Sequence, residues 1–330
     1  MNSTQLQSFL SAFKSKRVLV IGDIMLDRFL WGNVTRISPE APVPIVHVTR
    51  ESAYPGGAAN VARNLAPFAK SVSLLGIAGE DQHADQLISL LKETGIDTSG
   101  IIQDAEQETI VKTRVISRSQ HVVRIDRERP QPISDTTWER VWAWLEPQLD
   151  QLDAIILEDY AKGLISQAFV DQLAARLQGR KLIVTVDPNP GNPIVWKGAT
   201  AIKPNRKEAF AAARIKDPGD VTEEQLLAAL NPLAKNLFQQ WETELLLITL
   251  GEHGMALLHK DGKPAYHTPT RAREVFDVSG AGDTAIALFT LALAAGASGP
   301  DAAEISNIAS GIVVGKIGTA TVTPEELLGN

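Results

Sequence analysis

The chain has 330 residues, with 32 lysines and arginines against 39 aspartates and glutamates, so its formal charge is −7. This acidic balance argues against nucleic acid as the main partner, because binding to a phosphate backbone needs clustered cations. The absence of cysteine excludes disulfides, thiolate metal sites and cysteine nucleophiles. Apolar residues make up 44% of the chain, which excludes disorder as the main state.

No segment has the pattern of an export signal or a membrane span. The first residues are polar, unlike a secretory signal. The longest apolar run, Ala285–Ala297, is shorter than the roughly 20 residues that a bilayer requires. We therefore expect a buried helix there, no membrane partner and a cytoplasmic protein.

Short apolar runs alternate with amphipathic stretches along most of the chain. The runs predict buried strands at Arg17–Ile21, Val72–Leu75, Ala154–Leu157, Leu182–Val186, Ala201–Lys203 and Leu245–Leu250. The stretches between them predict helices near Ala58–Ala69, Asp81–Thr94, Ser166–Leu177, Glu223–Gln240 and Gly282–Ala295. Such alternation favours an α/β fold with helices around a mostly parallel sheet.

Two regions break this alternation. Phe29–Tyr54 and Ile110–Asp126 have strand character without an amphipathic helix between the strands. We interpret them as a small separate sheet that forms a lid across the end of the main sheet and shields the reaction from water. An edge hairpin with no moving part is the alternative. Because no linker-like segment is present, residues 1–330 are expected to form one domain with this lid.

The most informative segment is Asp277–Thr284, DVSGAGDT, between a strand-like run, Arg273–Phe276, and the long apolar helix. Its glycines let backbone N–H groups converge on an anion at the helix N-terminus. Asp283 would stand beside that anion as a base for an attacking hydroxyl, and a simple helix cap is the alternative. The glycine spacing also matches the dinucleotide fingerprint G-x-G-x-x-A, but no strand follows the helix, which disfavours an oxidoreductase.

Two further motifs carry polar groups at the start of predicted helices. Gly56–Asn60, GGAAN, combines glycines that permit close backbone approach with an amide that donates and accepts hydrogen bonds. Asn205-x-x-Glu208 places both side chains on one helix face, which suits water around Mg²⁺ near a nucleotide. A loop-to-helix junction and a helix-capping pair are the respective alternatives.

Polar residues near the first strand and in the lid could bind a sugar phosphate. Asp27 could accept hydrogen bonds from sugar hydroxyls, and a polar residue in a strand-to-loop turn is the alternative. A phosphate clamp could be drawn from the basic set Lys112, Arg114, Arg118, Arg124 and Lys162. Solvated charges on a β-ribbon are the alternative for any one of them.

Taken in order, these motifs resemble the ribokinase-like, phosphofructokinase-B family of sugar kinases. The resemblance is carried by Gly56–Asn60, Asn205-x-x-Glu208, Thr249-x-Gly251-x-x-Gly254 and Asp277–Asp283. It spans about Arg17 to Val322, which is nearly the whole chain. It implies a ribokinase-like three-layer α/β fold and an ATP-dependent phosphotransferase with Mg²⁺, and it leaves room for a monovalent cation.

The resemblance also implies a role for each matching residue. Asp283 would be the general base, and the backbone at Gly280, Ala281 and Gly282 would stabilise charge on the moving phosphoryl group. Asn205 and Glu208 would position Mg²⁺, through water, and the ATP phosphates. The residues near the nucleotide would be Thr249, Gly251, Gly254 and Asn307. The residues that hold the sugar would be Asp27, Gly56, Gly57 and Asn60, and charge favours Arg124 and Lys162 for a phosphate on it.

Within the family, the strings GDIMLDR, RISPEAPVP, PGGAANVA, DYAKG and GIVVGKIGTATV resemble the kinases of heptose 7-phosphate. This resemblance implies phosphorylation of the C1 hydroxyl of D-glycero-β-D-manno-heptose 7-phosphate to the 1,7-bisphosphate, on the route to ADP-heptose and the lipopolysaccharide core. Many such kinases are fused to a nucleotidyltransferase with an H-x-G-H motif. The motif is missing from this sequence, so a separate adenylyltransferase is expected.

Two other functions remain as alternatives to a heptose 7-phosphate kinase. A kinase for another sugar phosphate or a nucleoside would share the same catalytic motifs. A non-catalytic sugar-phosphate sensor is disfavoured because Asp283 and Glu208 are both present. The exposed edges of the lid strands predict a homodimer that pairs through them.

Overall fold

The computed structural model describes residues 1–117, 120–129, 131–272, 274–316 and 318–329. Its helices are α1 (Ser3–Phe13), α2 (Ala58–Leu65), α3 (Gln82–Glu93), α4 (Asp135–Leu145), α5 (Gln167–Leu177), α6 (Arg206–Ala213), α7 (Glu223–Trp241), α8 (Ala281–Ala294), α9 (Gly299–Val313) and α10 (Pro324–Leu328). Its strands are β1 (Arg17–Gly22), β2 (Ile24–Ile37), β3 (Pro44–Gly57), β4 (Ser71–Gly79), β5 (Asp97–Asp104), β6 (Ile110–Ser117), β7 (Gln120–Arg127), β8 (Ala154–Glu158), β9 (Ile183–Asp187), β10 (Ala201–Ile202), β11 (Leu245–Thr249), β12 (Met255–His259) and β13 (Tyr266–Thr268).

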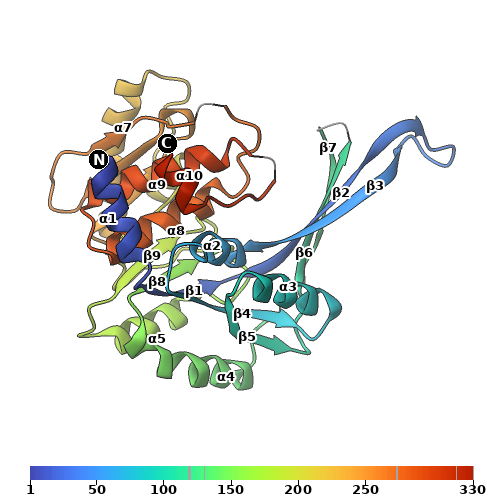
Figure 1. Cartoon of the computed structure of the whole chain (residues 1–330), viewed down its shortest axis with the longest axis horizontal. Coiled ribbons are helices and arrows are strands. Elements are labelled where there is room, and N and C mark those ends of the chain that lie inside the picture. The colour runs from blue at the N-terminus through green and yellow to red at the C-terminus, as the bar shows by residue number, and fades with distance from the viewer. Residues whose placement is uncertain (118–119, 130, 273, 317, 330) are drawn as a thin grey trace.

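The larger sheet has nine strands in the order β13-β12-β11-β10-β9-β8-β1-β4-β5. From β11 to β5 the neighbouring strands pair in parallel, whereas β12 and β13 are added antiparallel at one edge. One buried apolar cluster lies between this sheet and α1, α2, α3, α8 and α9, and a second lies between the sheet and α4 to α7 (Figure 1). The predicted α/β fold with a mostly parallel central sheet is therefore confirmed.

Apolar runs explain why these strands are central. β8 reads AIILE, and all five of its residues are buried, because helices cover both faces of the sheet. The long apolar segment forms α8, whose side chains from Asp283 to Ala292 are buried between the sheet and neighbouring helices. None of the helices in the described part of the chain is both long and apolar enough to span a bilayer.

The smaller sheet has four strands in the order β3-β2-β6-β7. The β2–β3 and β6–β7 pairs are antiparallel, and β2 and β6 run parallel. The segments expected as a lid, 29–54 and 110–126, supply most of these four strands, with residues 38–43 connecting β2 to β3; residues 118 and 119 lie outside the described residues. The β2–β3 ribbon projects away from the body of the molecule (Figure 1), so its outer part has no helix against it. Motion of this lid remains a prediction.

The strands and helices predicted from the sequence are present in the structure, with one exception. The six predicted strands are present as β1, β4, β8, β9, β10 and β11, and the five predicted helices as α2, α3, α5, α7 and α8. The prediction of a strand-like run at Arg273–Phe276, before the DVSGAGDT segment, is wrong. Residues 274–276 form no strand, and Arg273 lies outside the described residues. The N–H groups of Phe276 and Asp277 instead donate to the carbonyl of Val314, which ties this segment to the end of α9.

Candidate active site

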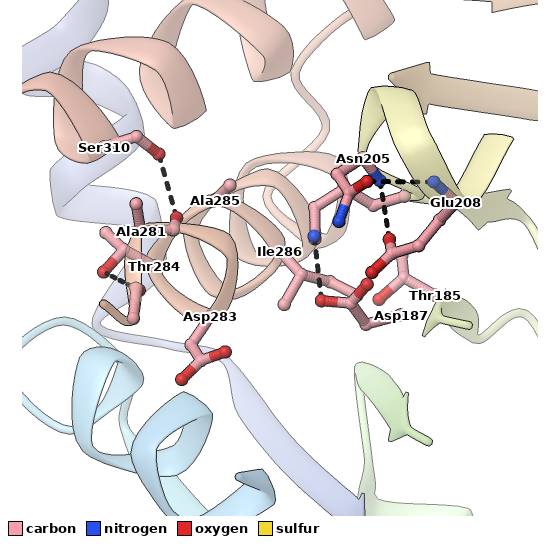
Figure 2. A network of polar contacts seen from close by, with 12 residues as sticks. Thr185, Asp187, Asn205, Glu208, Ala281, Asp283, Thr284, Ala285, Ile286 and Ser310 are labelled. Carbon is pink, nitrogen blue, oxygen red and sulfur yellow. Dashed lines mark hydrogen bonds and ion pairs between the residues drawn. The ribbon is translucent and has the colours of Figure 1, made fainter. Parts of the chain in front are cut away.

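Charged side chains gather where the parallel strands of the larger sheet end. Glu158 is the last residue of β8, Asp187 is the last residue of β9, and Lys203 directly follows β10. Ligands of open α/β sheets bind at this edge, where the carboxyl ends of the strands meet. Asp283, in the first turn of α8, joins them: one oxygen of Glu158, one of Asp187 and one of Asp283 lie within 4.8 Å of one another. Figure 2 shows that Asp187 and Asp283 come from two separate elements, β9 and α8.

Asp283 is held by two donors from other parts of the chain. Nδ2 of Asn60, on α2, donates to Oδ2 of Asp283 at 2.6 Å, and the Tyr160 hydroxyl donates to Oδ1 at 3.4 Å. The side chain is buried, with 8% exposed, and burial raises the pKa of this carboxyl, while the Asn60 hydrogen bond and Lys203 oppose the rise. The structure thus brings the predicted base Asp283 and the predicted sugar-binding residue Asn60 into direct contact.

The turn before Asp283 places the N-terminus of α8 beside Asn60. Gly280 has φ of +82°, and a Cβ there would lie 2.8 Å from Nδ2 of Asn60, so glycine is required for both conformation and space. Ala281 and Gly282 are the first helical residues, and their N–H groups have no partner within the helix; the Ala281 N–H donates to the carbonyl of Val278 in the preceding turn at 3.3 Å. Their positive dipole end suits an anion, as the sequence predicts.

Lys203 is the buried cation of the site, and its role escaped the sequence analysis. Its side chain is 4% exposed, and Nζ pairs with Oδ2 of Asp187 at 2.8 Å. A Cβ placed on Gly282 would lie 3.4 Å from this Nζ, so the ammonium stands beside the turn that opens α8. Burial disfavours the charged amine, but Asp187 and Glu158 outweigh burial and raise the pKa of Lys203.

The carboxylates around Lys203 outnumber it. Burial raises the pKa of Glu158 well above its usual value, with Asp187 and Asp283 adding to the effect, and burial also raises the pKa of Asp187 to about 7. Oε2 of Glu158 is buried without a hydrogen-bond partner among the described residues. Such oxygens are the ligands that Mg²⁺ prefers, so the residues present fit that cation.

The Asn205-x-x-Glu208 motif forms the capping pair that was its alternative interpretation. The Asn205 N–H donates to Oε2 of Glu208 at 2.7 Å, and the Glu208 N–H donates to Oδ1 of Asn205 at 3.0 Å (Figure 2). The pair therefore fixes the start of α6. The negative charge of Glu208 also contributes to the raised pKa of Asp187, which places it toward the carboxylate cluster. A role with Mg²⁺ remains a prediction.

The residues expected near the nucleotide lie around the β11–β12 turn. Thr249 forms an isolated parallel bridge with Asn205, and Gly251 and Gly254 enclose the short turn between the strands. Asn307, on α9, donates Nδ2 to Oγ1 of Thr268 at 2.9 Å and to the carbonyl of Pro269 at 2.7 Å. The structure brings these four residues to one side of the site, and their contact with a nucleotide remains a prediction.

The residues expected to hold the sugar lie where β2 and β3 meet α2. Gly57 has φ of +60°, and a Cβ there would lie 2.5 Å from the carbonyl oxygen of Asp23. A Cβ on Gly56 would strike the carboxylate of Asp27 in the same way. Asp27 is buried and lies within β2, where it lies opposite Lys112 of β6. It therefore does not lie in a strand-to-loop turn, which was the alternative.

The basic side chains are mostly paired with carboxylates. Arg114 pairs with Asp27. Arg124, expected at a phosphate, binds Asp126 through two hydrogen bonds of 2.8 and 2.9 Å, and it is 55% exposed. Lys162, the other residue expected there, pairs with Glu128 at 2.8 Å. Arg118 lies outside the described residues.

Four residues of the site were missed or left without a role by the sequence analysis: Glu158, Tyr160, Asp187 and Lys203. Three of them end or directly follow a buried apolar strand, as in AIILE, IVTVD and AIK. Because strand ends of a parallel sheet meet at one edge, a polar residue at that position is a signal that the sequence offers.

The chain is similar to known proteins over its whole length. The chain is 41% identical over 330 residues to the bifunctional protein HldE of Geobacter metallireducens, covering all of this chain and 66% of the relative. It is 45% identical over 325 residues to HldE of Magnetococcus marinus, covering 97% of this chain and 64% of that protein. The chain thus spans just under two thirds of the length of these relatives.

The fold has solved counterparts. A ribokinase of Arabidopsis thaliana complexed with ribose and ATP superposes with a TM-score of 0.73 at 19% identity, covering 96% of this chain and 98% of that one. Phosphofructokinase-2 of Escherichia coli in complex with potassium gives 0.74 at 17% identity, covering 96% and 97%. These likenesses confirm the ribokinase-like fold. Residues 15–326 match the pfkB family of carbohydrate kinases, and the chain belongs to that family.

Proposed function

We propose that this chain transfers the γ-phosphoryl group of ATP to the C1 hydroxyl of D-glycero-β-D-manno-heptose 7-phosphate, giving the 1,7-bisphosphate and ADP. The observation that carries the proposal is the position of Asp283, a buried carboxylate in the first turn of α8, where backbone N–H groups have no partner within the helix. A carboxylate repels phosphate, so its presence at an anion site is explained by proton transfer from the nucleophile.

In the proposed reaction the C1 oxygen attacks the γ-phosphorus, the bond from this phosphorus to the β,γ-bridging oxygen breaks, and ADP leaves with that oxygen. The proton of the C1 hydroxyl passes to Oδ1 or Oδ2 of Asp283. The raised pKa of Asp283 improves its strength as a base, because a base accepts a proton better as its own pKa approaches that of the donor. Asn60 orients the carboxylate through its 2.6 Å hydrogen bond.

Positive charge lies where the phosphoryl group would pass. The N–H groups at the start of α8 and the buried ammonium of Lys203 lie side by side, and both would stabilise the transferring oxygens. Asp187 and Glu158 would hold Mg²⁺, with Asn205 and Glu208 acting through water. When bound, Mg²⁺ would neutralise charge on the β- and γ-phosphates. Thr249, Gly251, Gly254 and Asn307 would lie beside the nucleotide.

The choice of heptose 7-phosphate is supported by similarity along the whole chain. The strings RISPEAPVP and DYAKG belong to the resemblance with heptose 7-phosphate kinases, and the curated relatives are named HldE. Asp27, Gly56, Gly57 and Asn60 would surround the sugar. An adenylyltransferase would then convert the product on the route to ADP-heptose and the lipopolysaccharide core. Solved phosphofructokinase-2 with potassium supports a monovalent cation as a further ligand.

A homodimer through the lid is also proposed. β3 and β7 are the edge strands of the four-stranded sheet, and β7 exposes 48% of Val123 and 54% of Ile125. Unpaired edges that carry apolar side chains tend to be covered by another copy of the strand. The lid of one protomer would then close over the site with support from its partner.

The test is ADP release with Mg²⁺ and ATP across heptose 7-phosphate, fructose 6-phosphate, fructose 1-phosphate, ribose and adenosine. Selective turnover of heptose 7-phosphate is expected. Turnover of another acceptor would keep the Asp283 chemistry and overturn the substrate. Tight binding of heptose 7-phosphate without ADP release would instead support a sugar-phosphate sensor.

A further inference from the structure

Among its described residues, one face of the lid carries the cations Lys112, Arg114 and Arg124, and Lys162 lies in the loop that follows β8. Residues opposite each other in a sheet share a face, as do residues two apart in one strand. Lys112 on β6 lies opposite Asp27 on β2 and Asp126 on β7, and Arg114 lies opposite Phe29 and Arg124. These six side chains therefore occupy one face of the small sheet.

This face looks toward the proposed base. Nζ of Lys112 lies 5.8 Å from the centre of the Tyr160 ring, within the range of a cation–π contact. The hydroxyl of the same tyrosine donates to Oδ1 of Asp283. Lys112 and Asp283 are thus linked through one aromatic side chain, with the ammonium at its face and the carboxylate at its hydroxyl end.

Arg114 and Arg124 on this face, and Lys162 in the loop after β8, each have a carboxylate partner, whereas Lys112 has none among the described residues. Arg114 pairs with Asp27, Arg124 with Asp126, and Lys162 with Glu128. Within the described ranges, no carboxylate oxygen lies within ion-pair distance of Nζ of Lys112. The side chain is nevertheless partly buried rather than free in solvent.

The surroundings of Lys112 disfavour an unpaired charge. Burial lowers the pKa of Lys112, and the positive charges of Lys162 and Arg124 lower it further. Asp126 and Glu128 act in the opposite direction, but each already neutralises one of those two neighbours. A partly buried ammonium among other cations is stabilised when an anion binds between them.

We infer that Lys112 anchors the phosphate that the acceptor sugar already carries, with Lys162 and Arg124 flanking it. This inference rests on the proposed phosphotransfer at Asp283 and deepens it, because Lys112 would select phosphorylated over unphosphorylated acceptors. Charge alone favoured Arg124 and Lys162 as the residues that hold this phosphate. Because each of them already pairs with a carboxylate, they would make secondary contacts to the phosphate. The tyrosine ring between Lys112 and Asp283 separates the standing phosphate from the hydroxyl that reacts.

The test compares acceptors that differ only in that phosphate. Steady-state ADP release is measured with D-glycero-D-manno-heptose and its 7-phosphate, and with fructose and fructose 6-phosphate, at saturating Mg²⁺ and ATP. The variants are Lys112→Met and Lys112→Arg, and circular dichroism and thermal melts check that both are folded. The matched control is Arg28→Met, which removes a lid cation from the opposite face of β2, where it pairs with Glu51.

Lys112→Met is expected to lower kcat/KM for the phosphorylated acceptor about 10- to 100-fold, chiefly through KM, because one charge-assisted contact to bound substrate is lost. The kcat/KM for the unphosphorylated partner should stay unchanged. Lys112→Arg should retain part of the discrimination, and Arg28→Met all of it. An equal loss with both members of a pair, or an unchanged KM for the phosphorylated one, would overturn the inference.

Failure of the proposed substrate gives a different result. If wild type prefers another sugar phosphate, the same comparison is made with that acceptor and its unphosphorylated partner. Wild type that prefers the unphosphorylated member of every pair would overturn the role of Lys112 and leave the kinase chemistry intact. If no acceptor releases ADP, calorimetric titration with heptose 7-phosphate and fructose 6-phosphate decides: weaker binding by Lys112→Met supports the anchor, and unchanged or absent binding refutes it.

Discussion

Asn60 and Asp283 are 223 positions apart in the chain, and Nδ2 of Asn60 lies 2.6 Å from Oδ2 of Asp283. Their helices, α2 and α8, lie against each other, and the next turn repeats the link through Asn64 and Thr284 at 2.8 Å. The GGAAN and DVSGAGDT segments of the sequence thus meet in one hydrogen bond. Burial raises the pKa of this carboxyl most, and the bond from Asn60 opposes that rise, so the bond contributes to the pH at which the proposed base is charged.

Asn60→Ala should move the acid limb of the pH profile of kcat/KM to higher pH. The hydrogen bond favours the charged carboxylate, so its loss raises the pKa of Asp283 further, and the active form is then lost earlier as pH falls. Asn64→Ala is the matched control, since it removes a bond between the same helices without touching Asp283. An acid limb that moves equally in both variants would remove this role from Asn60.

Asp283→Asn should keep the fold and lower kcat by about 10²- to 10⁴-fold, the usual contribution of a positioned base. Asparagine has nearly the same shape and cannot take the proton. Single-turnover kinetics with heptose 7-phosphate would measure the chemical step directly, and thermal melts would confirm folding. Asp171→Asn, on the exposed side of α5, is the control. Near wild-type turnover by Asp283→Asn would exclude Asp283 as the base.

Glu208→Gln should raise the Mg²⁺ concentration needed for half-maximal activity severalfold without altering stability. Glutamine at this position of a capping box still accepts a hydrogen bond from the Asn205 N–H, so the start of α6 is preserved. The lost charge is the one that acts on Asp187. Mg²⁺ titrations at saturating acceptor, with melting temperatures beside them, separate the two roles. If the Mg²⁺ titrations of Glu208→Gln and wild type coincide, Glu208 acts only as a helix cap.

The protein should unfold more easily as pH rises from about 4 to about 7. Burial raises the pKa of Asp187 to about 7 and that of Asp159 to about 6, from a value of 3.8 in the unfolded chain. The folded state therefore binds protons more tightly, and this stabilisation is complete below pH 3.8 and lost as pH passes through those higher values.

Urea unfolding of the unliganded protein at several values between pH 4.5 and pH 8 would measure this slope. Asp187→Asn should flatten it, because asparagine does not titrate, whereas Asp171→Asn should leave it as in wild type. The slope is the readout, since removing the partner of the buried Lys203 changes the absolute stability as well. An equal slope in Asp187→Asn and wild type would show that other groups cause the pH dependence.

The sequence predicts strands and helices of this fold because burial on both faces leaves continuous apolar runs. It cannot predict which strand ends become neighbours: Glu158 and Asp187 meet because β8 and β9 are adjacent in the sheet, and no local pattern encodes that order. The sequence analysis also did not predict the ion pair of Arg124 with Asp126, which lies two residues away on the same face of β7. Charge identified candidates for phosphate binding, and only the structure shows which of them already have partners.

The dimer proposed for the lid depends on apolar side chains of β7. Because Val123 and Ile125 are two residues apart, they share the face of β7 opposite Arg124 and are largely exposed. Val123→Lys combined with Ile125→Glu should therefore dissociate a lid dimer while leaving the cationic face in place.

Light scattering coupled to gel filtration at micromolar concentration would report the mass. Leu328→Lys, which alters an exposed apolar residue on α10, is the control and should leave the mass unchanged. Wild type that elutes as a monomer would refute the dimer. A dimer that survives the double substitution would place the contact elsewhere on the molecule.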